Sequence, residues 1–394
     1  MSKRAKRFDW KSFIAGIVGG LILAFSSAIF TPLGQWIIPK PPEITFEVEG
    51  KDGEKFKVSG PEAKRRWMHE KERKAIDEFN AGVEAHIAGN IDLARARYEE
   101  AIELKANYFE AHNNLGNVFG EQGMYKEAVK ELREAIRIKP DDALAHGNLG
   151  LVYRYQGKLE EAIAEYRVAI RLKPDLAETH FNLGFALGKQ GKIEEEIKEY
   201  REVIRLKPAH SKARTNLGFA LAKQGKTEEA ITEYREAIRL VPGYALAHNN
   251  LGSSLYGLGR LDEAVTEFCE AIRLTPEFAE AHSNLGLANF KQGKIDEAEK
   301  EFREALRLKP DYAEAHNNLG MALEKQGKTQ EHIAEYREAV RLKPDYAEAL
   351  GNLGKSLDKK GKRKEARVYW ERASKVEKDP EWIEYIKTRL AEPD

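Results

Sequence analysis

The sequence predicts an all-α protein, a solenoid of helix-turn-helix units preceded by one transmembrane helix and a short β-hairpin. Three observations lead to this fold class. A set of landmark residues returns every 34 residues through most of the chain, residues 12–39 carry no charge, and apolar and polar residues alternate between 44 and 58. Fixed internal periods of this length are typical of stacked repeat architectures.

The first forty residues are basic and then apolar. Residues 1–40 hold six Lys/Arg against one Asp, a net charge of +5, and the run from Phe13 to Phe30 is almost wholly apolar. A helix needs about 20 apolar residues to cross a bilayer core. We therefore expect a basic cytoplasmic N-terminus over 1–11 and a single-pass transmembrane helix over 12–38 in the lipid bilayer. By the positive-inside rule, the remaining chain is extracytoplasmic, either periplasmic or external.

The same stretch has a second interpretation, a cleaved secretory signal ending at the small residues Ser26, Ser27 and Ala28, which would leave a secreted or periplasmic protein. The uncharged run is longer than a signal core, and this favours the anchor. Gly16 and Gly20 have the Gly-x-x-x-Gly spacing at which two membrane helices can pack closely, so the spacing permits a homo-oligomer through this helix.

Residues 39–60 form a linker with a different pattern. Apolar residues alternate with polar ones over 44–49 and again over 55–58, and Asp52-Gly53 lies between the two runs. This arrangement predicts a β-hairpin with a tight turn at Asp52-Gly53. Pro61 then begins a charged helix over 61–74 that leads into the repeats.

The repeated units span 75–380, nine copies of 34 residues. In the copy at 279–312, apolar residues fall three and four apart on both sides of Gly293, which predicts two short amphipathic helices joined by a turn. Gly293 ends the first helix and Pro310 follows the second. One hairpin cannot bury its apolar face alone, so neighbours must stack. Residues 381–394 are expected to form a capping helix over the last exposed face.

These landmarks, Leu285-Gly286, Ala298, Phe302 and Pro310 in that copy, resemble the tetratricopeptide repeat (TPR) family. Small residues at Gly286 and Ala298 suit a close approach of two helices, and Phe302 supplies bulk. The resemblance implies a right-handed superhelix in which the first helix of each unit lines the inner, concave wall.

Neither composition nor motifs indicate catalysis. The 394-residue chain is formally neutral, so it lacks the basic footprint of a nucleic-acid binder. It has no Gly-rich phosphate loop, no Ser/His/Asp or Cys/His set and no paired-cysteine zinc spacing, so we expect no enzyme, cofactor or metal site. Six histidines do recur at repeat spacing, but stacked helices lie about 10 Å apart and a shared metal needs ligands at about 2 Å. We interpret them as packing residues: His112, His146, His180, His248, His282 and His316.

An array of asparagines, one before each Leu-Gly pair, is the first candidate binding site. A side-chain amide on a concave wall can both donate to and accept from the backbone of an extended peptide. The array resembles the asparagine ladder in the repeat arm of O-linked N-acetylglucosamine transferases, although the chain shows no transferase domain. The alternative is that each amide bonds a neighbouring helix. The candidates are Asn114, Asn148, Asn182, Asn216, Asn250, Asn284 and Asn318.

A second candidate position lies three residues after each asparagine and is apolar in the middle copies. Large exposed apolar patches usually mark interaction sites. The alternative is that some of these side chains contact the adjacent hairpin. The candidates are Leu151, Phe185, Phe219, Leu287 and Met321, with Phe181 beside them.

Together these features predict a membrane-anchored scaffold that docks or assembles other proteins, or extended peptide segments of them, through the concave groove. The first alternative is a permanent structural subunit of a larger membrane complex, and the second is an enzyme regulator.

Overall fold

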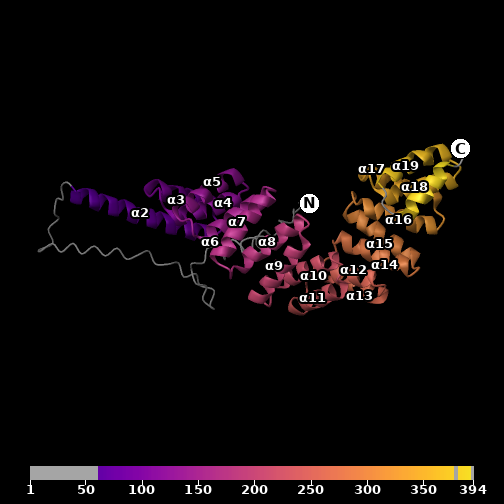
Figure 1. Cartoon of the computed structure of the whole chain (residues 1–394), viewed down its shortest axis with the longest axis horizontal. Coiled ribbons are helices and arrows are strands. Elements are labelled where there is room, and N and C mark those ends of the chain that lie inside the picture. The colour runs from indigo at the N-terminus through magenta and orange to yellow at the C-terminus, as the bar shows by residue number, and fades with distance from the viewer. Residues whose placement is uncertain (1–60, 377–379, 392–394) are drawn as a thin grey trace, which may run out of the picture. The chain divides into compact units, whose positions relative to one another are not determined.

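The structure is a computed structural model that describes residues 61–376 and 380–391. It divides into two compact units, one ending at Pro208 and the other beginning at Ala209. The helices are labelled in Figure 1. The first unit contains α2 (Pro61–Ile87), α3 (Ile91–Leu104), α4 (Phe109–Glu121), α5 (Tyr125–Ile138), α6 (Ala143–Tyr155), α7 (Leu159–Leu172), α8 (Ala177–Lys189) and α9 (Ile193–Leu206).

The second unit continues the pattern and adds a final helix. Its helices are α10 (Ser211–Lys223), α11 (Thr227–Leu240), α12 (Ala245–Gly257), α13 (Leu261–Leu274), α14 (Ala279–Lys291), α15 (Ile295–Leu308), α16 (Ala313–Lys325), α17 (Thr329–Leu342), α18 (Ala347–Lys359), α19 (Arg363–Val376) and α20 (Pro380–Ala391).

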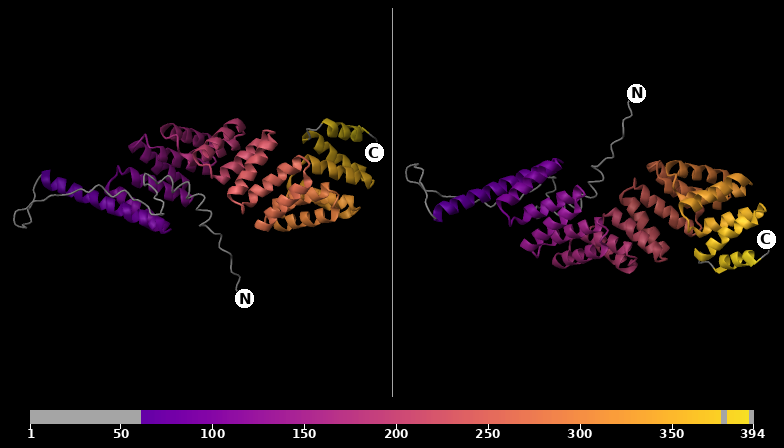
Figure 2. Two further views of the ribbon diagram at one scale, coloured as in Figure 1. Left: turned by 90° about the horizontal axis from the view of Figure 1, so that it is seen from below. Right: turned by 90° about the horizontal axis from the view of Figure 1, so that it is seen from above.

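Consecutive helices from α2 to α19 form antiparallel hairpins, and hairpins stack in chain order within each unit (Figures 1 and 2). We call the first helix of each hairpin its A helix (even-numbered, α2 to α18) and the second its B helix (odd-numbered, α3 to α19). Each B helix also packs on the A helix that follows it in the same unit. Neighbouring A helices, such as α10 and α12, contact one another more closely than neighbouring B helices do. The A helices therefore lie on the tighter side of each stack.

A glycine ends the turn between the two helices of every hairpin. Gly123, Gly225 and Gly293 have φ of 74°, 83° and 80°, and the corresponding glycines of the other hairpins have similar values. A Cβ at any of these three positions would meet no atom within 4 Å. Glycine is required there by the left-handed backbone alone, as at many helix C-termini.

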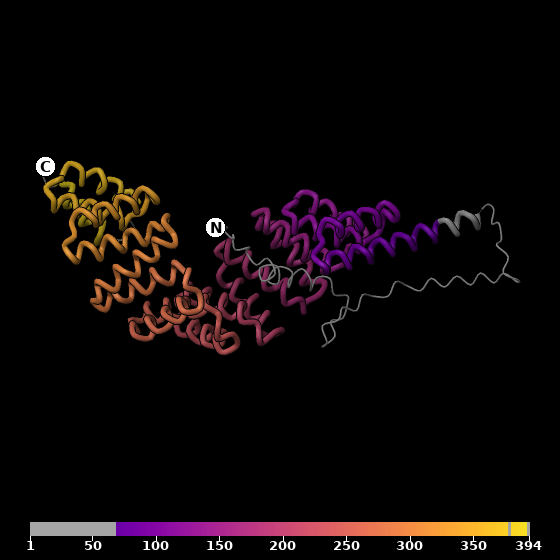
Figure 3. The backbone as a smooth tube through the Cα atoms, turned by 180° about the vertical axis from the view of Figure 1, so that it is seen from behind, coloured from indigo at the N-terminus to yellow at the C-terminus, as the bar shows by residue number. Residues whose placement is uncertain are grey.

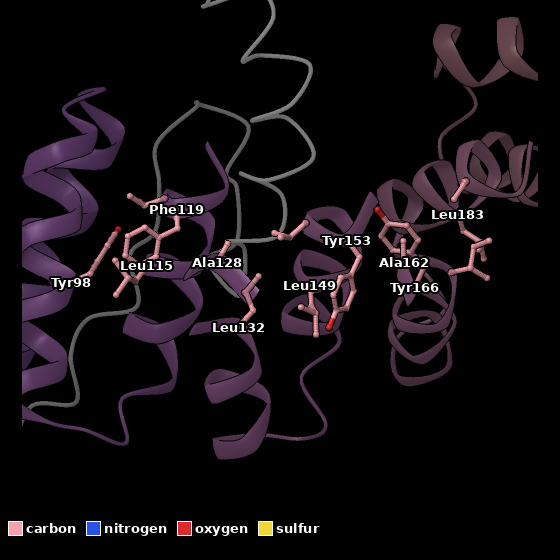
Figure 4. Close-up of a cluster of buried hydrophobic side chains, with 14 of the residues drawn as sticks. Tyr98, Leu115, Phe119, Ala128, Leu132, Leu149, Tyr153, Ala162, Tyr166 and Leu183 are labelled. Carbon is pink, nitrogen blue, oxygen red and sulfur yellow. The ribbon is translucent and has the colours of Figure 1, made fainter. Parts of the chain in front are cut away.

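A second glycine lets the two helices of each hairpin approach closely. A Cβ at Gly286 would lie 2.6 Å from Cε1 of Phe302, and one at Gly218 would lie 2.7 Å from Cε1 of Tyr234. Both rings are buried to 1% exposure or less. Such side chains form a row of core contacts between hairpins, as Figure 4 shows for Tyr98, Leu132 and Tyr166 in the first unit.

The two ends of the described chain differ from the interior repeats. Helix α2 is 27 residues long, so the charged helix predicted over 61–74 and the first helix of the first repeat are continuous. Figure 3 shows the later part of this helix in indigo, packed on the first hairpins. At the other end, Ile386 of α20 is fully buried, and Trp382, Tyr385 and Leu390 pack against the core of the last hairpins. Helix α20 thus covers an apolar surface that α18 and α19 would otherwise expose.

The predicted fold class needs correction. The part of the chain that the structure describes is wholly helical and has no strand. None of its helices combines the length and the apolar character needed to cross a bilayer, because the repeat helices are short and the longer α2 is rich in charged residues. The transmembrane helix predicted over 12–38, the Gly16/Gly20 contact and the β-hairpin predicted within 39–60 lie outside the described residues. The fold is therefore an all-α solenoid of hairpins, and the single-pass membrane localisation is withdrawn.

Candidate functional site

All the predicted site residues lie on A helices, and we call the exposed surface of the A helices within one unit the A face. Three of its asparagines bond the preceding hairpin. The Nδ2 groups of Asn148, Asn284 and Asn352 donate to the Oδ1 atoms of Asn113, Asn249 and Asn317 at 3.1, 2.9 and 3.0 Å. Each acceptor lies 35 residues earlier in the chain, so these amides link consecutive A helices.

The other asparagines of the array have no amide side chain 35 positions earlier in the sequence. Asn182 and Asn250 are half-buried, and the residues 35 positions before them are Gly147 and Thr215, which have no side-chain amide. Asn114 is buried and its Nδ2 lies 3.4 Å from the hydroxyl of Tyr98. Asn318 is also buried, at 7% exposure, and Asn216 is half-buried. The array is therefore not uniform, because its amides have different roles in the fold.

The difference between Asn284 and Asn250 gives a first prediction. Asn284→Ala should lower the free energy of unfolding by about 0.5–1.5 kcal/mol, because it removes an inter-hairpin hydrogen bond. Asn250→Ala should leave stability within about 0.5 kcal/mol of the parent protein. Urea titrations followed by circular dichroism measure both values. Equal losses in the two variants would contradict the assignment of separate roles.

The apolar candidates differ in how deeply their side chains are buried. Leu151 is buried in the first unit at 7% exposure, while Leu287 and Met321 are partly buried and pack against core clusters of the second unit. Phe181 is half-buried, with its ring centroid 5.7 Å from that of Tyr200. Phe185 is half-buried and Phe219 is 46% exposed. Of the six candidates, Phe219 offers the largest accessible fraction to a partner.

Cations lie over several of these rings, a feature that the sequence analysis missed. Lys223 Nζ is 4.4 Å from the ring centroid of Phe219 on α10, and Lys291 Nζ of α14 is 4.8 Å from that of Tyr256 on α12. In the first unit the guanidinium of Arg154 lies 5.1 Å from the centroid of Phe185. The signal was present in the sequence, since a lysine ends five of the A helices: Lys189, Lys223, Lys291, Lys325 and Lys359.

The six recurrent histidines lie at the start of A helices and join three elements each. In every one of them, Nδ1 lies 2.6 Å from a glutamate Oε2 of the B helix of the same hairpin. For His282 that residue is Glu301, and the Nε2 of His282 faces the backbone oxygen of Pro276 in the preceding turn at 3.2 Å. We call each such arrangement a histidine clamp. The others are His112–Glu131, His146–Glu165, His180–Glu199, His248–Glu267 and His316–Glu335.

Both ring nitrogens of a clamp face acceptors, and only the protonated imidazole can donate to both at once. For His146, His248 and His282, the hydrogen bond to glutamate is the largest influence and raises the histidine pKa above 6.5, while burial opposes it. For His112, His180 and His316, burial is the largest influence and lowers the pKa, but the bonds to glutamate and carbonyl outweigh it, so the pKa is again raised.

Other hairpins place a different ion pair at the clamp position. In the fifth hairpin Arg214 Nη1 donates to Glu233 at 2.8 Å, and in the first the charges are exchanged, with Arg97 donating to Glu78 at 2.7 Å. In the part of the chain that the structure describes, no three His, Cys, Asp or Glu side chains gather as a metal site requires. The histidines thus contribute to the packing of the hairpins, and each clamp adds an ion pair with glutamate to this packing.

Two family comparisons match most of the described chain. Residues 177–385 match the family described as "Cilia and flagella-associated protein 70 C-terminal domain". Residues 84–123, 116–154 and 150–191 match the family described as "TPR repeat". A search of curated proteins gave no match.

Solved structures share the fold. The chain is similar to the APC/C hetero-tetramer Cut9-Hcn1, with 18% identity and a TM-score of 0.54 over 68% of this chain and 52% of that one. It is also similar to a tetratricopeptide repeat protein from Parabacteroides merdae ATCC 43184, with 18% identity and a TM-score of 0.53 over 63% of this chain and 98% of that one. The chain thus spans about half the length of the first. These likenesses concern the fold alone, and the finer resemblance to O-linked N-acetylglucosamine transferases is not supported.

Proposed function

We propose that this chain is a scaffold that binds extended segments of other proteins on its A face. The chain belongs to the tetratricopeptide repeat family, and over residues 177–385 to the family of the C-terminal domain of cilia and flagella-associated protein 70. Proteins with this fold typically mediate protein–protein interactions and the assembly of complexes. The repeats and the similar repeat proteins favour a non-catalytic role for this chain.

The exposed aromatic side chains carry the proposal. Among the described side chains, the two most exposed aromatic residues are Tyr155, at 38%, and Phe219, at 46%, and both lie on A helices. Exposing a large ring to water is unfavourable, and aromatic residues are enriched among those that dominate binding energy at interfaces. In the second unit, Phe219 is accompanied by the amide of Asn250, which has no hydrogen-bond partner within the described chain.

Each unit can bind a partner segment by itself, through a side-chain amide and an aromatic ring. The partner's backbone would pair with an amide that offers both a donor and an acceptor, and the partner's apolar side chains would cover the ring. Asn250 and Phe219 are then the residues of the second unit that contact the partner. In the first unit, Asn182 and Phe185, which both lie on α8, take these two roles.

The second prediction concerns the double variant Asn250→Ala with Phe219→Ala. Partner affinity should fall by about tenfold or more, because an amide contributes about 0.5–1.5 kcal/mol and a buried aromatic anchor more. Partners are first identified by affinity capture of the full-length protein from native extract, and their affinity is then measured with purified components.

The matched control is Val368→Ala, which removes a 53% exposed apolar side chain from B helix α19 of the same unit. This control should bind as the parent protein does. Unchanged partner binding by a well-folded double variant would contradict the proposal. The stoichiometry of capture separates two forms of the function, because one partner per chain retained through purification indicates a permanent subunit, and a smaller amount indicates exchanging clients.

A further inference from the structure

Charge is segregated between the two sides of three consecutive hairpins in the second unit. A helices α10, α12 and α14 hold four Lys/Arg against a single glutamate, a net charge of +3 without their histidines. Their B helices α11, α13 and α15 hold thirteen Asp/Glu against six Lys/Arg, a net charge of −7. The A face is thus the positive side of a stack whose other side is strongly negative.

The first unit does not show this excess on its A face. Helix α4 has two glutamates and no Lys/Arg, α6 has one arginine, and α8 has one glutamate and one lysine. The positive surface is therefore a local feature of the A face from α10 to α14, continued by the exposed Lys325 at the end of α16.

Arg214 of α10 pairs with Glu233 at 2.8 Å, but three lysines of this surface have no carboxylate partner. Lys223, Lys291 and Lys325 are exposed and form no ion pair within the described chain. The arginines of the B helices differ, since Arg239 and Arg273 each bond a glutamate three residues earlier at 2.6–2.7 Å. The nearby carboxylates of the A helices are already engaged, Glu280 with Lys309 at 3.3 Å and Glu324 with Lys359 at 2.8 Å.

Aromatic rings hold two of these cations in place. Lys223 lies over Phe219 and Lys291 over Tyr256, and the second of these contacts joins α14 to α12. A cation over a ring face is attracted by the ring's quadrupole and keeps its free donors toward solvent. The ammonium group of Lys223 therefore lies beside Phe219, the exposed ring to which the proposed function assigns partner binding, and that of Lys291 lies beside the half-buried Tyr256.

We propose that the A face from α10 to α16 selects acidic segments of partner proteins, whose Asp and Glu side chains pair with Lys223, Lys291 and Lys325. The inference rests on the proposed function and specifies its partner. Complementary charge directs the encounter and selects between partners, and the negative B helices repel an acidic segment from the other side. A nucleic acid fits less well, because it requires a more extensive basic surface than three helices of net charge +3.

The test uses the full-length protein and phage-displayed random dodecapeptides. Selected sequences should be enriched in Asp and Glu over the input library. The best acidic peptide should bind the variant Lys223→Gln/Lys291→Gln/Lys325→Gln about tenfold more weakly, which corresponds to the loss of three exposed ion pairs. Fluorescence anisotropy measures this affinity, and added salt should weaken it.

The matched control is Lys126→Gln/Lys198→Gln/Lys300→Gln, which removes three exposed lysines from B helices and should retain acidic-peptide affinity. Selection of peptides without acidic enrichment, equal binding by both triple variants, or tighter binding of single-stranded DNA of the same length would each overturn the inference. If neutral peptides are selected and depend on Phe219, the proposed function stands without the acidic preference. If no peptide is selected, both fail.

Discussion

Phe302→Ala is expected to lower the free energy of unfolding by about 3–5 kcal/mol, the usual cost of removing a buried aromatic side chain. The ring is fully buried and fills the space that Gly286 leaves between α14 and α15. Because glycine has no side chain, the alanine at 302 would face an empty space that the two helices cannot easily close. Urea titration monitored by circular dichroism measures the loss.

The loss should also be local. Hairpins of a repeat stack are coupled to their neighbours, so stability is close to a sum of unit and interface contributions. Hydrogen exchange with mass spectrometry should show reduced protection in α14, α15 and the adjacent hairpins, with helices α4 to α7 unchanged. The control Lys300→Ala, exposed on the same helix, should change stability by less than about 0.5 kcal/mol. Equal loss of protection through the whole chain would contradict a stack of nearest-neighbour hairpins.

Raising the pH from about 6 to about 9 is expected to destabilise the fold through the six histidine clamps. Each clamp raises its histidine pKa above 6.5, so the folded state binds a proton more tightly than the unfolded chain. The stabilisation is therefore complete below pH 6.5 and is lost as the pH rises through the folded pKa. Hydrogen bonds to charged groups contribute about 1.5–3 kcal/mol each. Urea midpoints at the two pH values measure the combined effect.

A single clamp provides the control for this prediction. In His282→Gln the difference in the free energy of unfolding between about pH 6 and about pH 9 should shrink. A double-mutant cycle with Glu301→Gln should give a coupling energy that is present only at the lower pH. His332 has the opposite effect on stability, because burial lowers its pKa. It destabilises the folded state only as the pH falls below 6.5. A pKa of His282 below 6.5 by NMR would show that the clamp is wrong.

Much of the fold followed from local pattern. The 34-residue period predicted repeated helical hairpins, and the structure has them, with the turn at Gly293 and the close contact of Gly286 with Phe302. These features depend on residues within one hairpin, so a single copy contains the information. The membrane helix and the β-hairpin were inferred from hydropathy and alternation in residues 12–58, and a pattern of that kind does not fix where a segment lies in the folded molecule.

The site was less predictable because its contacts join different hairpins. Whether an asparagine of the array bonds its neighbour depends on the residue 35 positions earlier, which is Asn249 for Asn284 but Thr215 for Asn250. The histidines were interpreted as packing residues, yet the glutamate 19 positions later, such as Glu301 for His282, was overlooked. Both relations can be found in the sequence once the stacking geometry is known.

The proposal that partners bind the A face is tested most directly by site-specific photo-crosslinking in cells that make the protein. A photoreactive phenylalanine derivative is placed at Phe219, on A helix α10, and in a second protein at Lys300, on B helix α15 of the same unit. Mass spectrometry then identifies the partner peptides joined to each position. The account predicts that one partner peptide is captured repeatedly at 219 and not at 300. Capture of the same partner at 300, with none at 219, would place binding on the B helices and contradict it.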